Sequence, residues 1–388
     1  MWPLLQCGQL SIALARRYRE SMATISQRQL NRTFLERQFL LERTSQGPLP
    51  VVSRLLALQS QAANSPYEAL WNRIEGFHPS DLDRLYEDQR VVRGTWFRST
   101  VQTTTTEDFL SLRGIHSELF AGKHVFMDHL IGTFGSDWSE RLRAECARAG
   151  DLTGKDISTL ACRLFPGENS RHWEASWIRR VLPLLRRPSG PGGRTRGSRD
   201  TWIEVESYLG RLPEPATPKS RSELVLKYLE GYGPATVADA SNFLGLKGLK
   251  PIFEALNLVE HRSEDGAVLY DLPEAALADP DRDAPPRLMA SFDHSILGHS
   301  DRTRIIDPGY SKILSGANAV FKPYILLDGR VEGYWAYSLK KDAPQIKLRY
   351  FSRPTASQEA LLFAEAEAWC RAWYGKADGL SFDIGDHS

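Results

Sequence analysis

One order of elements recurs three times in the first 280 residues of this chain: several helices and then a pair of short strands. The third copy is the clearest, because a helix over Ser222–Tyr232 is followed by a Gly-Pro turn and by Thr236 and Asp239, a capping pair that starts the next helix. After a helix over Leu249–Leu256, an Asp-Gly pair within Leu258–Tyr270 predicts a β-hairpin. Winged helix-turn-helix domains combine such helices with a hairpin. The sequence therefore predicts an α+β fold with three tandem winged helix-turn-helix units, over residues 22–135, 136–217 and 218–280.

The first copy carries two amides close together. Ser26 and Gln29 predict a capping box at the start of its first helix, and an apolar run predicts a second helix over Pro50–Gln61. Gln59 and Gln61 stand at the end of this second helix. Solvated surface is the ordinary interpretation of such a pair, because glutamine is a good helix former. The meaning of the two amides therefore depends on the rest of the chain.

Two more helices and a strand pair complete the first copy. The helices are predicted over Tyr67–Ile74 and from Pro79 onward. The segment Val91–Thr104 is rich in the β-branched and aromatic residues that favour strands, and Gly94 is the expected bend within it.

The second copy has a strongly basic end. Its predicted helices cover Asp137–Ala149, Ile157–Leu164 and Glu174–Arg187. Residues 171–199 include eight arginines and one acidic residue, and a Gly- and Pro-rich loop before the strand Thr201–Val205 stands where a wing would lie. A wing that contacts DNA phosphates and a solvated helix face with a linker explain this cluster equally well.

The residues after position 280 have a different pattern. Pro280–Pro286 forms a linker. Short strands are then predicted over Leu288–Phe292, Val320–Asp328, Arg330–Tyr337 and Gln345–Phe351. Together with a last helix over Ser357–Tyr374, they predict a small β-barrel within residues 281–388. At the other end, residues 1–21 are interpreted as a dispensable tail or as a start assigned too early, with Met22 as the first residue.

The composition excludes several classes of protein. A net charge of +1 argues against a polybasic tail, although it is compatible with a basic face balanced by acidic surface elsewhere. The four cysteines lie far apart without Cys-x-x-Cys spacing, and the nine histidines include no His-Glu-x-x-His motif. We therefore expect no disulfide framework, no metal and no cofactor. The scattered cysteines fit a protein of the reducing cytoplasm. The chain has no run of about 18 apolar residues, which argues against a membrane span.

Six short segments carry a resemblance to a known family. In chain order they are Leu58-Gln59-Ser60-Gln61, Arg98-Ser99-Thr100-Val101-Gln102, Tyr232-Gly233-Pro234-Ala235-Thr236, Ser291-Phe292-Asp293-His294, Asp301-Arg302 and Leu327-Asp328-Gly329-Arg330. In their order and spacing the chain resembles the AlkZ/YcaQ proteins, bacterial winged-helix DNA glycosylases that act on alkylated and crosslinked DNA. The resemblance extends over about residues 26–374. It implies three winged-helix units around a concave surface of duplex size, with a C-terminal β-barrel.

The resemblance gives the two amides a role. The family's catalytic motif is Gln, a hydrophobic residue, and then Gln or Asp. Gln59 and Gln61 occupy the outer positions of this motif, as in the AlkZ-like branch. Ser60 departs from the hydrophobic middle position, which we interpret as a local change of packing. Gln102 stands where relatives commonly have His, so a histidine's role at that position does not carry over.

Two amides are chemically suited to this reaction. An N7- or N3-alkylated purine is already cationic, so its glycosidic bond breaks with little acid catalysis. Amides can hold a water through donor and acceptor contacts and direct its attack on the sugar C1′. No lysine lies beside Gln59 and Gln61 in the sequence to form a Schiff base, so water is the expected nucleophile.

These features predict a monofunctional DNA glycosylase for bulky or crosslinked alkylated purines, serving self-resistance to a DNA-alkylating natural product. The expected partner is double-stranded DNA, bound by a monomer, and the expected DNA-binding residues are Arg98, Arg194, Arg196, Arg199, Arg262 and Arg302. The alternative is a transcriptional regulator, since winged helices are most often regulators and a fold alone does not give a function. A regulator would be expected to have one such unit with a dimerisation region, whereas this chain has three units and no heptad pattern.

Overall fold

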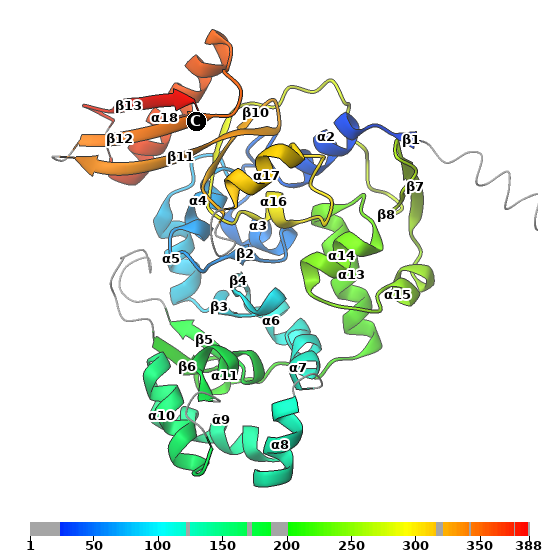
Figure 1. Ribbon diagram of the computed structural model, residues 1–388, viewed down its shortest axis with the longest axis vertical. Helices are drawn as coiled ribbons and strands as arrows, with labels where there is room; N and C mark the ends of the chain where they lie inside the picture. The colour runs from blue at the N-terminus through cyan, green and yellow to red at the C-terminus, as the bar shows by residue number, and fades with distance from the viewer. Residues whose placement is uncertain are drawn as a thin grey trace, which may run out of the picture.

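The computed structural model describes residues 24–121, 125–168, 173–187, 201–315, 321–340, 343–375 and 377–386. Its helices and strands confirm the α+β class (Figure 1). No helix within these residues is long and apolar enough to cross a membrane. The predicted tail over residues 1–21 and the predicted wing residues Arg194, Arg196 and Arg199 lie outside the described residues. The elements follow one another in four segments, here called segments 1 to 4, over residues 24–134, 138–209, 218–271 and 287–386.

Segment 1 contains the helices and the strand pair that the sequence predicts, with different bounds. Its elements are β1 (Thr24–Ile25), α2 (Gln27–Arg37), α3 (Pro48–Arg54), β2 (Leu58–Gln59), α4 (Ser65–Trp71), α5 (Pro79–Glu87), β3 (Val91–Thr95), the 3₁₀ turn η1 (Phe97–Ser99), β4 (Val101–Thr105), α6 (Thr106–Leu112), α7 (Gly114–Ala121) and α8 (Val125–Phe134). Ser26 is confirmed as the N-cap of α2 and accepts a hydrogen bond from Gln29 N (3.1 Å). The expected return contact is wrong, because the Gln29 side chain donates to Ala278 O instead.

The predicted helix over Pro50–Gln61 is wrong beyond Arg54. Helix α3 ends there, Leu56 adopts a left-handed φ of 62°, and the chain then continues as strand β2. All the apolar residues of this run are buried, so their spacing could not separate a helix from a strand. The candidate amides consequently lie on and just after a strand.

The predicted bend at Gly94 is also wrong. Gly94 lies inside β3, and the chain turns at η1, where Arg98 has a φ of 50°. A Cβ atom at Gly94 would lie 2.9 Å from Cε2 of Phe109 and 3.2 Å from Cδ2 of Leu185. Glycine is needed here because α6 and a neighbouring strand pack closely on the sheet at this point.

Segment 2 differs from its prediction at the third helix. Its elements are α9 (Trp138–Ala149), α10 (Gly154–Leu164), α11 (Ala175–Val181), β5 (Leu184–Arg187), β6 (Thr201–Glu204) and α12 (Val205–Leu209). The predicted helix over Glu174–Arg187 is wrong beyond Val181, because Leu182 is extended (ψ 138°) before Pro183 and the chain becomes strand β5. A residue before proline disfavours the helical conformation, and that signal was present in the sequence.

The strands of segments 1 and 2 form one sheet. Its order is β2-β4-β3-β5-β6, and every neighbouring pair is antiparallel. The two segments meet where Gly94 of β3 pairs with Leu185 of β5. The hairpin that carries the predicted basic wing is therefore joined by hydrogen-bonded strands to the strand that carries Gln59.

Segment 3 follows its prediction closely. Its elements are α13 (Pro218–Tyr232), α14 (Val237–Leu244), α15 (Lys250–Ala255), β7 (Val259–Ser263) and β8 (Val268–Asp271). The capping pair of Thr236 and Asp239 is confirmed, and β7 and β8 form the predicted antiparallel hairpin. Strand β1 adds to this hairpin in parallel with β7, which ties the start of segment 1 to segment 3.

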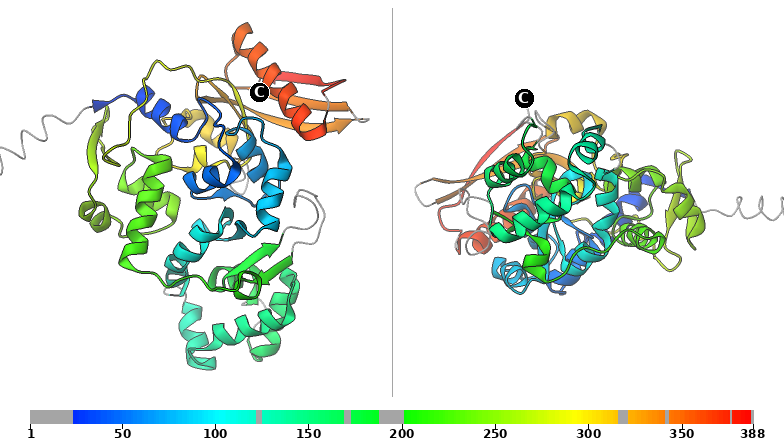
Figure 2. Two further views of the ribbon diagram at one scale, coloured as in Figure 1. Left: turned by 180° about the vertical axis from the view of Figure 1, so that it is seen from behind. Right: turned by 90° about the horizontal axis from the view of Figure 1, so that it is seen from below.

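Segment 4 contains a five-stranded sheet covered by a helix. Its elements are β9 (Arg287–Met289), α16 (His294–Leu297), α17 (Pro308–Leu314), β10 (Tyr324–Leu327), β11 (Arg330–Lys340), β12 (Ala343–Tyr350), α18 (Ala356–Tyr374) and β13 (Ser381–Asp386). The strand order is β13-β12-β11-β10-β9, and the β-barrel stays a prediction. Figure 2 shows α18 across one face of this sheet, where Trp369 packs edge-on against Trp335 with ring centroids 5.2 Å apart.

The largest hydrophobic core joins three of the four segments. It contains Phe34 and Phe97 from segment 1, Tyr232 and Phe243 from segment 3, and Tyr324 from segment 4. The rings of Tyr232 and Phe243 lie 4.4 Å apart, and that of Phe97 lies 5.7 Å from Phe243. Segments 1, 3 and 4 therefore share one interior.

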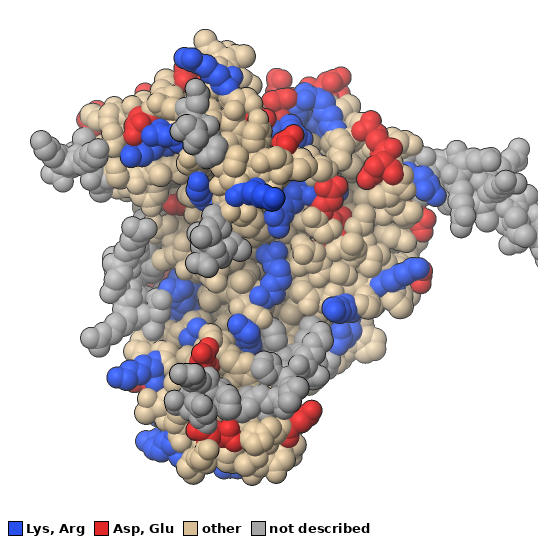
Figure 3. Space-filling model, in the orientation of Figure 1, with Lys and Arg blue, Asp and Glu red and all other residues tan. Residues whose placement is uncertain are grey.

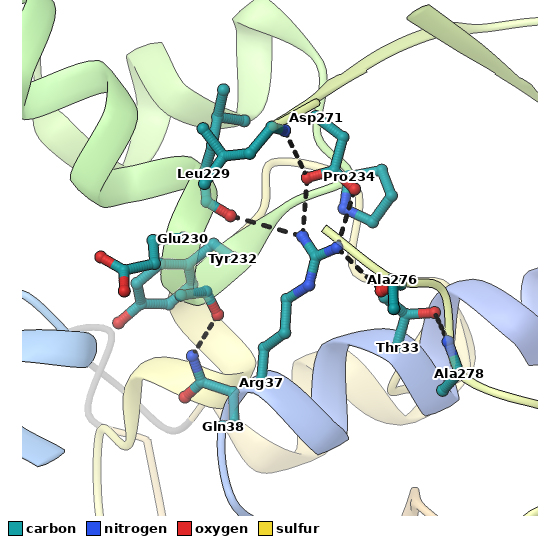
Figure 4. A network of polar contacts seen from close by, with 12 residues as sticks. Thr33, Arg37, Gln38, Leu229, Glu230, Tyr232, Pro234, Asp271, Ala276 and Ala278 are labelled. Atoms are coloured by element: carbon teal, nitrogen blue, oxygen red, sulfur yellow. Dashed lines mark hydrogen bonds and ion pairs between the residues drawn. The ribbon is translucent and has the colours of Figure 1, made fainter. Parts of the chain in front are cut away.

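Two buried ion pairs cross the same junction. Arg37 of α2 donates to both carboxylate oxygens of Asp271 at the end of β8, at 2.7 and 2.8 Å (Figure 4). Arg73, just after α4, donates to both oxygens of Asp293 at 2.8 Å each, and both side chains are 1% exposed. Charges that are almost fully buried need such two-bond geometry, because an unpaired charge would be costly in the interior.

The free energy of unfolding is expected to decrease as the pH falls from about 6.5 to about 5. Burial lowers the pKa of His116, His294 and His299 to about 3, so the folded state keeps them neutral while the unfolded state binds protons. Glu68 acts in the opposite direction, because burial raises its pKa to about 7 and the folded state retains its proton. The net difference rises from less than one proton near pH 6.5 to about two protons near pH 5, so the slope reaches about 3 kcal/mol per pH unit only at the acid end of this range.

Urea unfolding across this pH range measures the slope. The His294→Gln variant is expected to have a smaller slope than the parent chain, because it removes one buried neutral histidine. A free energy of unfolding that stayed constant over this range would contradict neutral buried histidines.

Candidate active site

The pairing of β2 with β4 decides where the candidate amides point. Gln59 lies opposite Gln102, and Leu58 lies opposite Thr103. Side chains alternate along a strand, and directly opposite residues share a face. Gln59 and Gln102 therefore lie on one face of the sheet, and Leu58 and Thr103 lie on the other. Gln61 follows Gln59 by two residues, and its side chain lies on the same side as that of Gln59.

The two amides contact each other. Gln59 Nε2 donates to Gln61 Oε1 across 3.5 Å, a long hydrogen bond. Gln59 Oε1 accepts from the backbone N–H groups of Ser60 (2.7 Å) and Gln61 (3.1 Å). Gln59 is 4% exposed, whereas Gln61 is exposed. The carbonyl oxygen of Gln59 is thus used to hold the backbone, and Gln61 is the amide that faces solvent.

Ser60 is buried in a polar environment on the opposite side. Its Oγ donates to Leu58 O (3.1 Å) and lies 2.6 Å from Thr103 Oγ1. Thr103 Oγ1 lies in turn 2.5 Å from the hydroxyl of Tyr86. A hydrophobic residue at position 60 would remove the Ser60 hydroxyl that the pair formed by Thr103 and Tyr86 contacts.

Gln102 adds a third amide to the face of Gln59. It is 0% exposed, and its Nε2 donates to Thr100 Oγ1 (2.6 Å). Its Oε1 is buried and has no hydrogen-bond partner within the described part of the chain. Buried acceptors without a partner are rare, so this face of the sheet has unused polar capacity beside Gln59.

The structure brings two of the predicted DNA-binding arginines together. Arg98 is half-buried in the η1 turn, with its guanidinium over the ring of Phe243 (5.6 Å) and Nη1 donating to Leu297 O (3.4 Å). Burial lowers the pKa of Arg98, and the nearby charge of Arg302 lowers it further. Arg302 is half-buried, with its guanidinium 5.2 Å from the ring centroid of Phe321.

The other predicted arginines lie apart from this pair. Arg262 is on β7 in the segment 3 hairpin, and its Nη1 donates to Gly266 O (3.3 Å). Figure 1 shows β7 at the opposite side of the molecule from β5 and β6. Arg194, Arg196 and Arg199 fall outside the described residues, between β5 and β6.

Sequence reasoning missed an arginine that contacts the amide motif. Arg186 of β5 donates from Nη1 to Ser60 O (3.4 Å), so segment 2 reaches the residue between the two glutamines. Arg186 falls within the predicted helix over Glu174–Arg187, where the structure has strand β5. The signal that could have placed it on a strand is Pro183, just before β5.

Basic side chains gather around the middle of one face. Figure 3 shows Lys and Arg across the centre of this view, while Asp and Glu lie mostly towards its edges. The outline of the molecule is indented at this level, between the sheet of segment 4 and the helices of segment 2. Figure 1 places β2 and β4 at the same height in the same orientation. A basic area on this face is therefore compatible with the net charge of +1.

Comparison with known proteins identifies the family. Residues 52–372 match the family model described as DNA glycosylase AlkZ-like. The interstrand DNA cross-link repair glycosylase of Streptomyces sahachiroi is 25% identical over 326 residues, which are 78% of this chain and 85% of that protein. The solved structure of Streptomyces sahachiroi DNA glycosylase AlkZ, 22% identical, has the same fold, with a TM-score of 0.72 over 93% of this chain and 100% of that chain. Because the family model spans most of its length, this chain belongs to the AlkZ-like DNA glycosylase family.

Proposed function

We propose that this chain is a monofunctional DNA glycosylase of the Gln-x-Gln branch, which hydrolyses the N-glycosidic bond of bulky or crosslinked N7- or N3-alkylated purines. The observation that carries this proposal is the contact between Gln59 and Gln61 on one side of strand β2, in a chain of a glycosylase family. The six segments that resemble the family include both residues.

The geometry divides the work between the two amides. Gln59 Oε1 already accepts two backbone N–H groups, so the acceptor for a catalytic water is Gln61 Oε1, which keeps a lone pair beyond its long contact with Gln59. Gln59 Nε2 has two N–H bonds, and the second is the donor to the same water. The water is then directed towards C1′ of a sugar that develops positive charge, which is catalysis by positioning and electrostatics.

The expected architecture gives this site access to duplex DNA. Segments 1 to 3 act as three winged helix-turn-helix units, and segment 4 as a small barrel, around a concave basic face. The hydrogen-bonded sheet joins β5 and β6, which flank residues 188–200 in the sequence, to the amide strand. Arg98 and Arg302, two like charges held close together, form a natural site for a DNA phosphate, which removes their mutual repulsion.

The proposed substrates follow from the resemblance and from the Streptomyces sahachiroi relative, an interstrand DNA cross-link repair glycosylase. The AlkZ-like branch is tied to DNA-alkylating natural products, so the proposed biological role is self-resistance to such a toxin. The enzyme acts as a monomer in the cytoplasm and requires no cofactor.

Replacing either amide is expected to slow excision by tenfold or more while leaving the affinity for DNA near that of the parent chain. One lost contact in the transition state is worth a few kcal/mol. Gln61→Ala tests the acceptor, and Gln61→Glu should keep more activity than Gln61→Ala because it retains an oxygen acceptor. Single-turnover release of an alkylated purine measures the rate, and fluorescence anisotropy measures binding.

The matched control is Gln46→Ala, which truncates another exposed glutamine of segment 1. Gln46→Ala should leave the excision rate and the affinity for DNA unchanged. Parent-like excision by both Gln59→Ala and Gln61→Ala would remove the assignment, and an equal loss of rate and binding would indicate misfolding.

Replacing predicted phosphate contacts is expected to weaken binding to all DNA sequences alike. Each lost contact reduces the slope of log affinity against log salt by about 0.9. Arg302→Gln should therefore reduce the slope by about one unit, and replacement of Arg194, Arg196 and Arg199 together by up to about three. Affinity measured over a salt series gives these slopes.

Arg330→Gln is the control from the same part of segment 4, because Arg330 Nη1 donates to Thr303 O inside the protein. The slope of log affinity against log salt for Arg330→Gln should equal that of the parent chain. An unchanged slope in the triple variant would instead assign the basic loop to ordinary solvated surface.

The products are expected to be the free adducted base and an abasic site, with strand cleavage only after alkali. A water nucleophile leaves no covalent intermediate, so borohydride should trap no link between protein and DNA. A trapped link would indicate that a lysine, and not water, is the nucleophile. Excision of small methyl adducts but never of bulky crosslinks would overturn the self-resistance role and leave the glycosylase activity intact.

The alternative, a transcriptional regulator, gives a different result in the same experiments. It would shift DNA of one particular sequence on a gel and would release no base from alkylated DNA. The Gln61→Ala variant would then behave like the parent chain in every assay.

A further inference from the structure

Ser60, the residue between the two candidate amides, has each of its polar groups engaged. Its backbone N–H donates to Val101 O (2.9 Å) and is shared with Gln59 Oε1. Its carbonyl oxygen accepts from Arg186 Nη1. Its hydroxyl joins Leu58 O and Thr103 Oγ1. Ser60 is 0% exposed, so these bonds form without competition from solvent.

The hydroxyl contacts run in one direction. The three contacts can all be hydrogen bonds in one way: Ser60 donates its one hydroxyl proton to Leu58 O, and its oxygen accepts from Thr103. Thr103 has then used its proton as well, so its oxygen accepts from Tyr86. Each hydroxyl is a donor to the next group, and the order is Tyr86, Thr103, Ser60 and Leu58 O.

This hydroxyl chain lies on the face of the sheet opposite the amides. Thr103 and Leu58 share one face, and Gln59 and Gln102 share the other. Strand β2 has only two residues, so its own ladder holds it weakly. The hydroxyl chain connects the turn after β2 to α5, which carries Tyr86, and thereby fixes the direction in which the glutamines leave the backbone.

We propose that Tyr86, Thr103 and Ser60 are positioning residues that hold the Gln59–Gln61 segment in its reactive geometry by a directional chain of hydroxyl groups. The inference rests on the proposed glycosylase function. It also explains the departure at Ser60, because in this chain hydrogen bonds replace the packing that a hydrophobic middle residue would provide. Hydrogen bonds are directional, so they fix the orientation of the Gln59–Gln61 segment as well as its depth of burial. Packing alone fixes the orientation less sharply.

Thr103→Val is the central test, because valine keeps the shape of threonine and removes the hydroxyl shared by Ser60 and Tyr86. The single-turnover excision rate should fall tenfold or more, while the dissociation constant for DNA stays within about twofold. Thr103→Ser keeps a hydroxyl and should recover most of the rate. Hydrogen–deuterium exchange of the peptide that covers Leu58–Gln61 should become faster in Thr103→Val and stay slow in Thr103→Ser.

A double-mutant cycle tests whether Ser60 and Thr103 act as one unit. If they do, Ser60→Ala with Thr103→Val is no slower than the slower single variant, since both remove the same connection. Multiplied losses of rate in the double variant would overturn the hydroxyl chain.

Tyr228→Phe is the control for Tyr86→Phe. Tyr228 is a buried tyrosine of segment 3, and its hydroxyl donates to Gly298 O (2.9 Å). Both variants lose a buried hydrogen bond and should lose similar stability, but only Tyr86→Phe should lose excision rate. Equal rates in the two variants would reduce the role of Tyr86 to stability alone.

The outcomes separate this inference from the proposed function. Suppose that the parent chain excises the base, that Gln61→Ala is slow and that Thr103→Val excises at the parent rate. The positioning inference would then be wrong, and the proposed glycosylase activity would stand. If the parent chain excises no alkylated base, the proposed glycosylase activity and the catalytic role of the hydroxyl chain are both wrong. Unchanged hydrogen exchange in Thr103→Val would overturn the positioning role whatever the activity.

Discussion

The guanidinium of Arg73 is the point at which three of the four segments are joined. It donates to both oxygens of Asp293, and its Nη2 also donates to Gln38 Oε1 (3.2 Å), while Gln38 Nε2 donates to Gly231 O (2.7 Å). Burial alone would raise the pKa of Asp293, but the charge and hydrogen bonds of Arg73 outweigh it and hold that pKa below its usual range. Removing one partner of such a pair costs about 3–5 kcal/mol, whereas replacing both by apolar residues can cost nothing. The pair therefore matters chiefly because it permits one arrangement of the segments.

The candidate site depends on that arrangement. Strand β2 is too short to be stable alone, and it lies where two hydrophobic cores meet: Leu56 and Ala57 belong to the core shared by segments 1, 3 and 4, and Leu58 belongs to the core beneath α18. Thr104 Oγ1 donates to Leu56 O (2.7 Å), which fixes the backbone just before the motif. The amides are consequently held by contacts from distant parts of the chain, so a mutation far from Gln59 can alter their geometry.

Local signals in the sequence predicted local structure well, and non-local pairing decided the rest. The capping pair of Thr236 and Asp239 and the Asp-Gly hairpin depend on neighbouring residues, and both are confirmed. The helix assigned to the amide motif was wrong because residues buried on every side lose their periodicity. The union of two hairpins in one sheet rests on the single residue pair Gly94 and Leu185, which no local pattern encodes. Likewise, the resemblance gave Gln59 and Gln61, but their common side of a strand and the polar setting of Ser60 follow only from the pairing of β2 with β4.

The exposure of Gln61 bears on which lesions the proposed site can reach. An enzyme that flips a base encloses it in a pocket, and a base tethered to both strands cannot leave the helix. Gln61 instead is exposed to solvent beside a buried Gln59. A site of this kind would approach the sugar from a groove while the adduct stays in the duplex. The discrimination would then come from the positive charge already present on the alkylated purine, since an unmodified base would still need a general acid that the amide pair does not supply.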